Sequence, residues 1–282
     1  MRIIRSGKWT GLLSAAAWLL LLLPGLELVR VAVAITGAWF LEDHEQLGQR
    51  TIYADREGGG YRGAPVALGD FDGDGLVDLV LAPMSASSGP EGDRDSGGRV
   101  HLIRGNGRIE GVVRIGAPPA EATVLTLEGA RDGDMTGTEL EVRDLDGDGH
   151  DDLLVGAQNY DGGGRDNSGA VWILWGGPHV FASTRSIDLL DAPFEDPAAA
   201  GLPRLSRIDG AEPGERLGIW TSAGDFDGDG RADLAIGADQ YSITGRNRVG
   251  RVWIIYDARE LPDVLDLAAP GDVVARTIVG VD

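Results

Sequence analysis

The sequence predicts an all-β fold built from repeated four-stranded units. Three similar acidic segments, GDFDGDGLVDL, RDLDGDGHDDL and GDFDGDGRADL, begin at Gly69, Arg143 and Gly224. Each runs into an unbroken apolar stretch, and a glycine-led stretch rich in Val, Ile, Leu and Trp begins 25 to 28 residues after its first Asp. Self-similarity at a long period indicates a repeat architecture, and short apolar runs bounded by Gly and Asp are strand signals.

Each unit is expected to contain a strand, an acidic loop, a second strand, a glycine-rich turn, a third strand, a long connection and a fourth strand. The acidic loops begin 74 and then 81 residues apart. The fourth strand ends at Gly129 in the first unit and at Gly210 in the second, after the apolar runs VLTLEG and LSRIDG. The third strands are GRVHLIRG (98–105), GAVWILWG (169–176) and GRVWIIYD (250–257). The longest connection, 177–205, is expected to hold a short helix.

The third strands place a large ring at one repeated position. Trp172 and Trp253 occupy it in the second and third units, and His101 occupies it in the first. Because these positions are repeat-equivalent, we expect their side chains to pack in the core between units and not to form a platform on which sugars stack. Trp220 has no counterpart in the other units. It is the better candidate for a site-specific role, but we expect it too in the core.

The composition is strongly acidic. The chain has 45 Asp and Glu against 25 Lys and Arg, a formal charge of −20, and no cysteine. So negative a surface disfavours nucleic acid and anionic lipid as partners and points to cations. Without cysteine there are no disulfides, so an exported chain of this composition must be stabilised by packing and by bound ions.

The N-terminus is predicted to be an export signal. Arg2, Arg5 and Lys8 precede the apolar stretch GLLSAAAWLLLLLPG, and Ala32-Val33-Ala34 offers a cleavage site with small residues. The alternative is an uncleaved anchor, but the apolar stretch is shorter than the ~20 residues that a membrane span needs. We therefore expect a mature chain without a membrane span, located outside the cytoplasm. The predicted division is a signal peptide (1–34), a linker or first strand (35–49) and the repeat domain (50–282).

The acidic loops predict three structural calcium sites. Calcium takes six to eight oxygen ligands at flexible distances, and alternating positions of a tight loop can direct several carboxylates inward. Positions 1, 3, 5 and 9 supply carboxylates, position 7 supplies a main-chain carbonyl, and glycines at positions 4 and 6 allow the sharp turn. The predicted ligands are Asp70, Asp72, Asp74, Leu76 and Asp78; Asp144, Asp146, Asp148, His150 and Asp152; and Asp225, Asp227, Asp229, Arg231 and Asp233.

Other interpretations of these loops fit less well. An EF-hand needs Glu at position 12 between two helices, but here Leu81, Val155 and Ile236 stand there, inside β-like apolar runs. Zinc is disfavoured because His150 is the imidazole in these loops and its counterparts are not zinc ligands. Asp-Gly is also a strong turn former, which could explain one copy. Three copies with the same spacing of four acids favour calcium.

The loop D-x-D-G-D-G-x-x-D-L, the V/I-G-A that follows it and the glycine-led strand together resemble the FG-GAP repeat over about residues 50–282. That repeat builds the N-terminal β-propeller of integrin α subunits and occurs in many secreted bacterial proteins, including those with the related VCBS-type repeat. The resemblance implies radial blades of four antiparallel strands, with calcium bound between the first two strands of each blade. It also implies adhesion or ligand binding at the face opposite the calcium loops.

The chain holds about three blades and the start of a fourth, which is too few for a closed ring, because propellers close with about four to eight blades. In the last residues, RTIVGVD, Gly280 matches Gly210 and Gly129. We therefore expect a partial propeller that is completed by further blades of the same polypeptide or by oligomerisation.

The favoured function is a non-catalytic binding or adhesion module for a protein or glycan ligand. Three complete acidic loops are present, while the four histidines, His44, His101, His150 and His179, share no spacing typical of a catalytic triad or a metal cage. One alternative is the propeller scaffold of an extracellular polysaccharide-acting enzyme, with its residues in the loops 84–98, 158–168 and 239–249. The other is a purely structural surface component.

Overall fold

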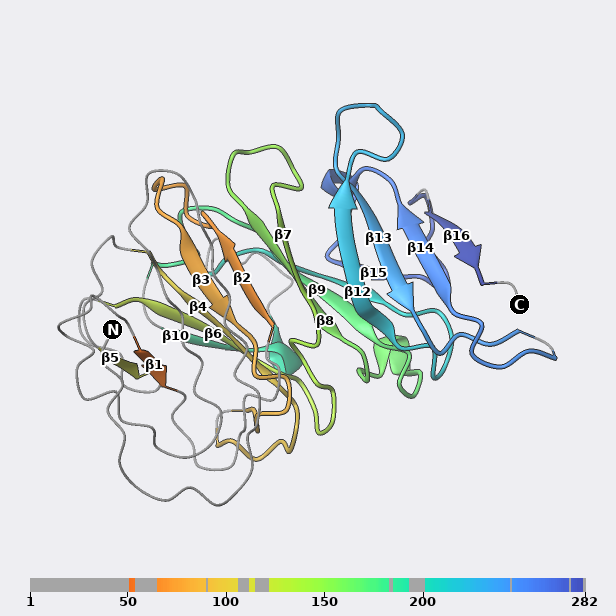
Figure 1. The fold of residues 1–282 in the computed structure, drawn as a ribbon, viewed down its shortest axis with the longest axis horizontal. Coiled ribbons are helices and arrows are strands. Elements are labelled where there is room, and N and C mark those ends of the chain that lie inside the picture. Colours follow the sequence, from red (N-terminus) through yellow and green to blue (C-terminus); the bar gives the residue numbers. More distant parts are fainter. Residues whose placement is uncertain are drawn as a thin grey trace, which may run out of the picture.

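The chain forms three antiparallel β-blades that stand side by side (Figure 1). This computed structural model describes residues 51–53, 65–89, 91–105, 112–114, 122–182, 185–192, 201–243, 245–273 and 275–280. The predicted signal peptide and linker lie outside the described residues. No α-helix occurs in the described part, so nothing there has the length and apolar character of a membrane-crossing helix.

The predicted strand order is confirmed in each blade. Blade 1 comprises β2 (Val66–Gly69), β3 (Asp78–Leu81), β4 (Arg99–Ile103) and β6 (Val124–Glu128). Blade 2 comprises β7 (Leu140–Arg143), β8 (Asp152–Ala157), β9 (Ala170–Leu174) and β11 (Leu205–Asp209). Blade 3 comprises β12 (Leu217–Gly224), β13 (Asp233–Ala238), β14 (Arg251–Ile255) and β16 (Ala275–Val279), so the strand in the last residues completes blade 3 and does not start a fourth blade.

A further strand, which the sequence did not predict, crosses from each blade to the blade before it. The connection between the third and fourth strands of blade 2 contains β10 (Arg185–Asp188), which pairs in parallel with β6 of blade 1. In the same way β15 (Val264–Asp266) of blade 3 pairs with β11, and β5 (Val112–Arg114) of blade 1 pairs with β1 (Thr51–Tyr53). By this pattern β1 takes the place of the outer strand of a preceding blade.

The predicted helix in the 177–205 connection is not seen in its described part, which holds β10 and a single 3-10 turn, η3 (Leu189–Asp191). Two more such turns, η2 (Gly162–Gly164) and η4 (Ala258–Glu260), lie in other connections. The backbone of β10 is satisfied by pairing with the edge of blade 1, so this part of the connection is extended.

Paired arginines fasten the crossing strands to the blades that receive them. Arg94, in the turn after β3, places Nη1 and Nη2 at 2.5 and 2.7 Å from the two carboxylate oxygens of Asp188 in β10. Arg165, at the equivalent place in blade 2, contacts Asp266 of β15 at 2.5 and 3.2 Å. Such bidentate pairs are stronger and more directional than single hydrogen bonds. The crossing strands therefore join neighbouring blades covalently through the chain and noncovalently at the edge.

Two apolar cores lie between the blades. The core between blades 1 and 2 contains Trp172, which is 1% exposed and packs edge-on against Tyr160 with 5.9 Å between ring centroids. The core between blades 2 and 3 contains Trp253. The predicted packing of both tryptophans is confirmed. His101, at the same position in blade 1, is buried, and its Nδ1 lies 2.9 Å from the hydroxyl of Thr126.

The approach of blade 3 to blade 2 is close enough to require glycine. A Cβ atom on Gly156 of β8 would lie 2.0 Å from the carbonyl oxygen of Gly218 in β12. Glycine allows this contact because it has no side chain. The glycine in the V-G-A run after the second loop therefore has a packing role.

Trp220 is not in the core, so that expectation is wrong. It lies on the face of blade 3 that points away from blade 2 and is 63% exposed. In this face Trp220, Gly237, Val252 and Ile278 pair across the four strands. The equivalent row in blade 2, which includes Val171 and Ile208, is buried by blade 3.

Burial raises the pKa of Asp134 to about 7. Two influences oppose this shift: the N–H of Arg131 donates to the carboxyl at 2.7 Å, and the positive charges of Arg131 and Arg94 favour its ionised form. Because the folded-state pKa lies above the unfolded value, the penalty of ionising Asp134 grows as pH rises from about 4 to about 7 and is complete above it. Asp134→Asn is expected to raise the melting temperature at pH 8 and to change it little at pH 5.

The control for this prediction is Asp132→Asn, which removes the same charge from an exposed neighbour. The measurement is thermal unfolding, followed by circular dichroism, at both pH values with chelator present. An equal shift for the two variants at pH 8 would contradict the buried-carboxyl explanation.

Candidate metal centres

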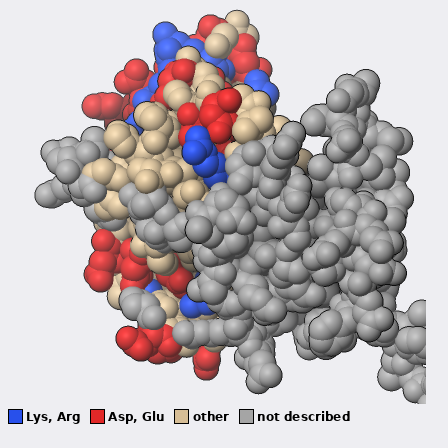
Figure 2. All heavy atoms as spheres, turned by 90° about the vertical axis from the view of Figure 1, so that its left-hand side faces the viewer, with Lys and Arg blue, Asp and Glu red and all other residues tan. Residues whose placement is uncertain are grey.

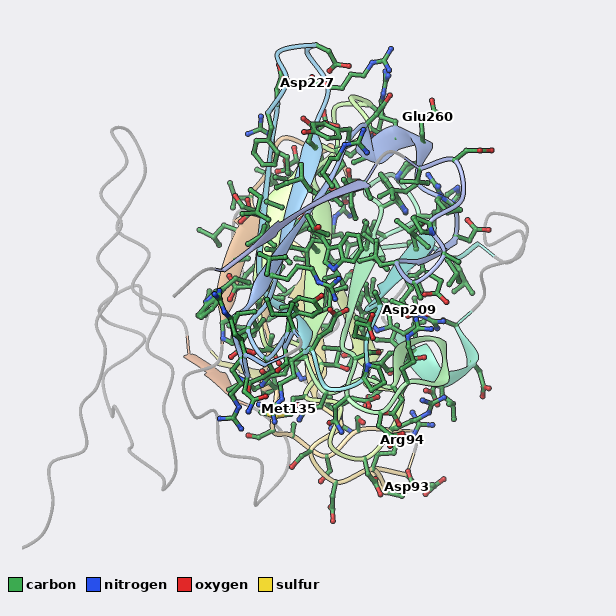
Figure 3. All side chains as sticks on the ribbon, turned by 90° about the vertical axis from the view of Figure 1, so that its right-hand side faces the viewer. Asp93, Arg94, Met135, Asp209, Asp227 and Glu260 are labelled. Carbon is green, nitrogen blue, oxygen red and sulfur yellow. The ribbon has the colours of Figure 1, made fainter. Side chains whose placement is uncertain are left out.

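The three acidic loops lie at one end of the blades. Each connects the first two strands of a blade, β2 to β3, β7 to β8 and β12 to β13, and all three project at the top of Figure 1. Figure 3 shows Asp227 at this end. Arg94, between β3 and β4, and Met135, between β6 and β7, lie at the opposite end. The radial repeat thus places three equivalent acidic loops on one rim.

Short-range hydrogen bonds shape each loop. In the second loop both carboxylate oxygens of Asp144, at position 1, accept main-chain N–H bonds, from Gly147 at 2.7 Å and from Gly149 at 3.1 Å. Both glycines have positive φ, 79° and 91°, which a side chain would strain. Asp146 accepts from the N–H of Asp148, two residues on, at 3.2 Å. In the third loop Asp225 accepts the same two bonds, from Gly228 and Gly230, and in the first loop Asp70 accepts from the N–H groups of Asp74 and Gly75.

The aspartate at position 9 ties the loop to the third strand. Asp152 is 1% exposed and accepts from the N–H of Leu145 and from that of Gly176, both at 2.7 Å. Asp78 and Asp233 are equally buried and bridge the corresponding points of blades 1 and 3. This bracing role was not predicted; within the loop the bond always spans seven residues, but the distance along the chain to the third strand is 27 residues in blade 1 and 24 in blades 2 and 3.

The burial of these carboxyls is costly without a cation. Burial is the main cause that raises the pKa of Asp78 to about 6 and that of Asp152 to about 7, against the lowering effect of their two N–H bonds. Burial and the neighbouring Asp148 likewise raise the pKa of Asp146. A divalent cation among the carboxylates would favour their charged forms and offset this penalty.

The structure brings three predicted acids together in each loop. Within each group, one oxygen per residue lies within 4.8 Å of the others. The groups are Asp70, Asp72 and Asp78; Asp144, Asp146 and Asp152; and Asp225, Asp227 and Asp229. Asp74, Asp148 and Asp233 lie outside these groups. The donor atoms are all oxygens, which suits a hard cation such as calcium and not a metal that prefers nitrogen or sulfur.

The residues at position 7 differ in their surroundings. Leu76 is exposed, the Nδ1 of His150 lies 3.0 Å from Asp148, and the guanidinium of Arg231 pairs with Asp257. Because these three side chains are chemically unrelated, they are compatible with ligation by the main-chain carbonyl at this position. Ligation by these carbonyls stays a prediction.

Arginines neutralise the first and third loops unequally, a feature that the sequence did not predict. Arg104, at the end of β4, places Nε 2.6 Å from Asp72 and Nη2 3.0 Å from Asp74. In the third loop Arg231 lies 3.6 Å from Asp229. Among the ion pairs of the described residues, the second loop takes part only through His150. A dication would therefore compete with a different set of positively charged side chains for the carboxylates of each loop.

Asp152→Ala is expected to lower the free energy of unfolding by about 3 kcal/mol in EDTA, because it strands two buried N–H groups at about 1–3 kcal/mol each and removes one costly buried carboxyl. In calcium the loss is expected to be larger, because a predicted ligand is also removed. Asp148→Ala is expected to destabilise only when calcium is present, because its carboxylate is 45% exposed and its bonds stay within the loop. Urea unfolding with calcium or EDTA measures both. The bracing role is contradicted if Asp152→Ala has no effect in EDTA.

Comparison with known proteins identifies the repeats. Residues 136–174 and 217–255 match the FG-GAP repeat family, and each match covers the first three strands and the acidic loop of one blade. Integrin alpha-PS5 of Drosophila melanogaster is 31% identical over 189 residues, which is 66% of this chain and 16% of that protein. Integrin alpha-PS2 of the same organism is 32% identical over 220 residues, 76% of this chain and 12% of that protein.

Phosphatidylinositol-glycan-specific phospholipase D of Mus musculus is 30% identical over 142 residues, half of this chain and 15% of that protein. The chain therefore spans a small part of the relatives it matches. A row of four-stranded blades with an acidic loop at the same end of each defines a β-propeller-type repeat protein. Its repeats are FG-GAP repeats like those of integrin α subunits, as the sequence predicted.

Proposed function

We propose that the protein is an exported, calcium-stabilised binding module without catalytic activity. The observation that carries this proposal is the convergence of three carboxylates in each of three equivalent loops on FG-GAP blades. The bonds of Asp152 to Leu145 and Gly176 tie such a loop to the ends of two strands. A cation held there would stabilise the blade and leave the opposite rim available for a partner.

Calcium is the proposed ion at all three loops. Carboxylates at positions 1, 3, 5 and 9 and a carbonyl at position 7 would hold it, and the ion would neutralise charge that otherwise opposes folding. Extracellular calcium modules bind at roughly 10⁻⁴ to 10⁻³ M, so such sites would be filled outside the cell. The proposed location is accordingly outside the cytoplasm, reached through the predicted signal in residues 1–34.

The proposed partner is a protein or a glycan. The formal charge of −20 disfavours nucleic acid and anionic membranes as partners. The test is a glycan array and a crosslinking pull-down with the secreted chain, in calcium and in EDTA. Saturable, calcium-dependent binding to one partner class is expected. Turnover of a polysaccharide without any such partner would instead favour the alternative of an enzyme scaffold, and neither result would favour a purely structural role.

Further blades of the same repeat type are the proposed neighbours of blade 3. Its outer face exposes Trp220 and Ile278, each at 63%, in the row whose counterpart in blade 2 is buried by the next blade. The outer edge of β16 corresponds to the edges of β6 and β11, which each receive a crossing strand. Amide hydrogen exchange in β16 that slows when a following blade is present would support this arrangement, and unchanged exchange would contradict it.

A further inference from the structure

A cavity of about 690 Å³ opens between blades 2 and 3. It is lined by the turns before β9, β12 and β14, so it lies at the end of the blades opposite the acidic loops, the end marked by Met135 in Figure 3. We call it the rim pocket. Its lining residues are Asn167, Gly214, Arg216, Gln240, Ser242, Asn247 and Arg248.

The backbone beneath the rim pocket belongs to the fold. Asn167, Arg216 and Arg248 have positive φ of 48°, 58° and 56°, and the N–H of Arg216 donates to the carbonyl of Asn167 at 3.3 Å. Between blades 1 and 2, Met135 and Ser96 repeat this geometry, with φ of 56° and 53° and an N–H to carbonyl bond of 3.1 Å. Because the scaffold is common to both junctions, the difference between them lies in the side chains. At these positive-φ positions the junction of blades 2 and 3 carries Arg216 and Arg248, whereas Met135 and Ser96 at the other junction are uncharged.

No described acidic residue forms an ion pair with either of these two arginines, whereas Arg94, Arg165 and Arg251 each pair with an acid. Figure 2, viewed from the side of blade 1, shows acidic side chains toward both ends of the described surface, with Lys and Arg side chains among them. Two unpaired guanidinium groups in one concavity of a chain with formal charge −20 make a local site for anions.

We propose that the rim pocket binds an acidic peptide segment through its carboxylates, an inference that rests on the proposed binding function. A guanidinium group offers a planar fork of donors that matches a carboxylate. The side-chain amides of Asn167, Gln240 and Asn247 offer both donors and acceptors to the peptide groups of an extended segment. None of the described lining residues has an aromatic ring on which a sugar could stack, so the chemistry favours a peptide over a glycan.

The test compares two biotinylated peptides, Gly-Ser-Asp-Ser-Glu-Ser-Gly and its neutral isostere Gly-Ser-Asn-Ser-Gln-Ser-Gly, on a sensor surface with the secreted chain in calcium. The acidic peptide is expected to bind more tightly despite the negative charge of the protein. Arg216→Gln and Arg248→Gln are each expected to weaken its binding about tenfold, the loss of one charge-assisted contact. Arg248→Lys keeps the positive charge but loses the planar fork of donors, so its affinity for the acidic peptide is expected to lie between those of the wild-type protein and Arg248→Gln.

The matched control is Arg276→Gln, which removes an exposed arginine of β16 that lies outside the pocket. It is expected to leave binding unchanged, and all variants should have the melting temperature of the wild-type protein. Equal binding of the two peptides, or equal weakening by Arg276→Gln, overturns the proposal. If the partner found by array or pull-down binds the Arg216 and Arg248 variants normally, the proposed function stands and the rim pocket assignment fails.

Discussion

Removal of calcium is expected to lower the free energy of unfolding of the secreted chain by about 4 kcal/mol. At free calcium near ten times Kd, each site contributes roughly 1.4 kcal/mol by mass action, and three sites act together. The effect is large because typical domains are stable by only about 5–15 kcal/mol. Its physical source is the repulsion among carboxylates such as Asp144, Asp146 and Asp152, whose oxygens lie within 4.8 Å of one another.

Thermal and urea unfolding, followed by circular dichroism, would measure this change in calcium and in EDTA. Magnesium at the same ionic strength is the control, because general screening would act equally with either ion, whereas magnesium accommodates poorly to a flexible, carboxylate-rich loop. Isothermal titration should give a stoichiometry near three. Unfolding curves that do not respond to chelator would refute the proposed metal centres.

Trp172→Ala is expected to cost about 3–5 kcal/mol, the range for truncating a large buried aromatic side chain. Its indole is 1% exposed in the core between blades 1 and 2, where it meets Tyr160 edge-on and the guanidinium of Arg207 lies 5.2 Å from its ring. The side chains around it come from two blades, so the cavity cannot close without moving one blade against the other. Urea unfolding gives the change in free energy.

Trp220→Ala is the matched control, because it removes the same side chain from the exposed face of blade 3. Its expected effect is within about 0.5 kcal/mol, as for surface substitutions elsewhere. Comparable losses for the two variants would mean that the outer face of blade 3 is covered in solution, and the assignment of the two faces would then be wrong.

The repeated strands and acidic loops could be predicted because their signals lie within short stretches. Asp144 bonds to N–H groups three and five residues away, and Asp152 bonds to one seven residues away, so an eleven-residue segment contains most of the loop geometry. The alignment of Trp172 with Trp253 likewise placed both in the cores. The bond from Asp152 to Gly176 could not be foreseen from the loop alone, because it depends on the pairing of β8 with β9.

The crossing strands could not be predicted from the sequence, for a physical reason. β10 has four residues inside a long connection, and its hydrogen-bonding partners are supplied by the edge of another blade. Arg94 lies 94 residues before Asp188, and Arg165 lies 101 residues before Asp266. No local pattern marks either pair, although the repeated spacing of the arginines could have drawn attention to them.

By itself the sequence determined the all-β class, the order of strands within each blade and the acidic loops, because strand periodicity and loop geometry follow from neighbouring residues. Only the tertiary structure decided which blade faces are buried, where the crossing strands dock and how Arg216 and Arg248 meet at one pocket. These features depend on contacts between segments far apart in the chain. Such contacts acquire their energy only when one blade removes the surface of another from water.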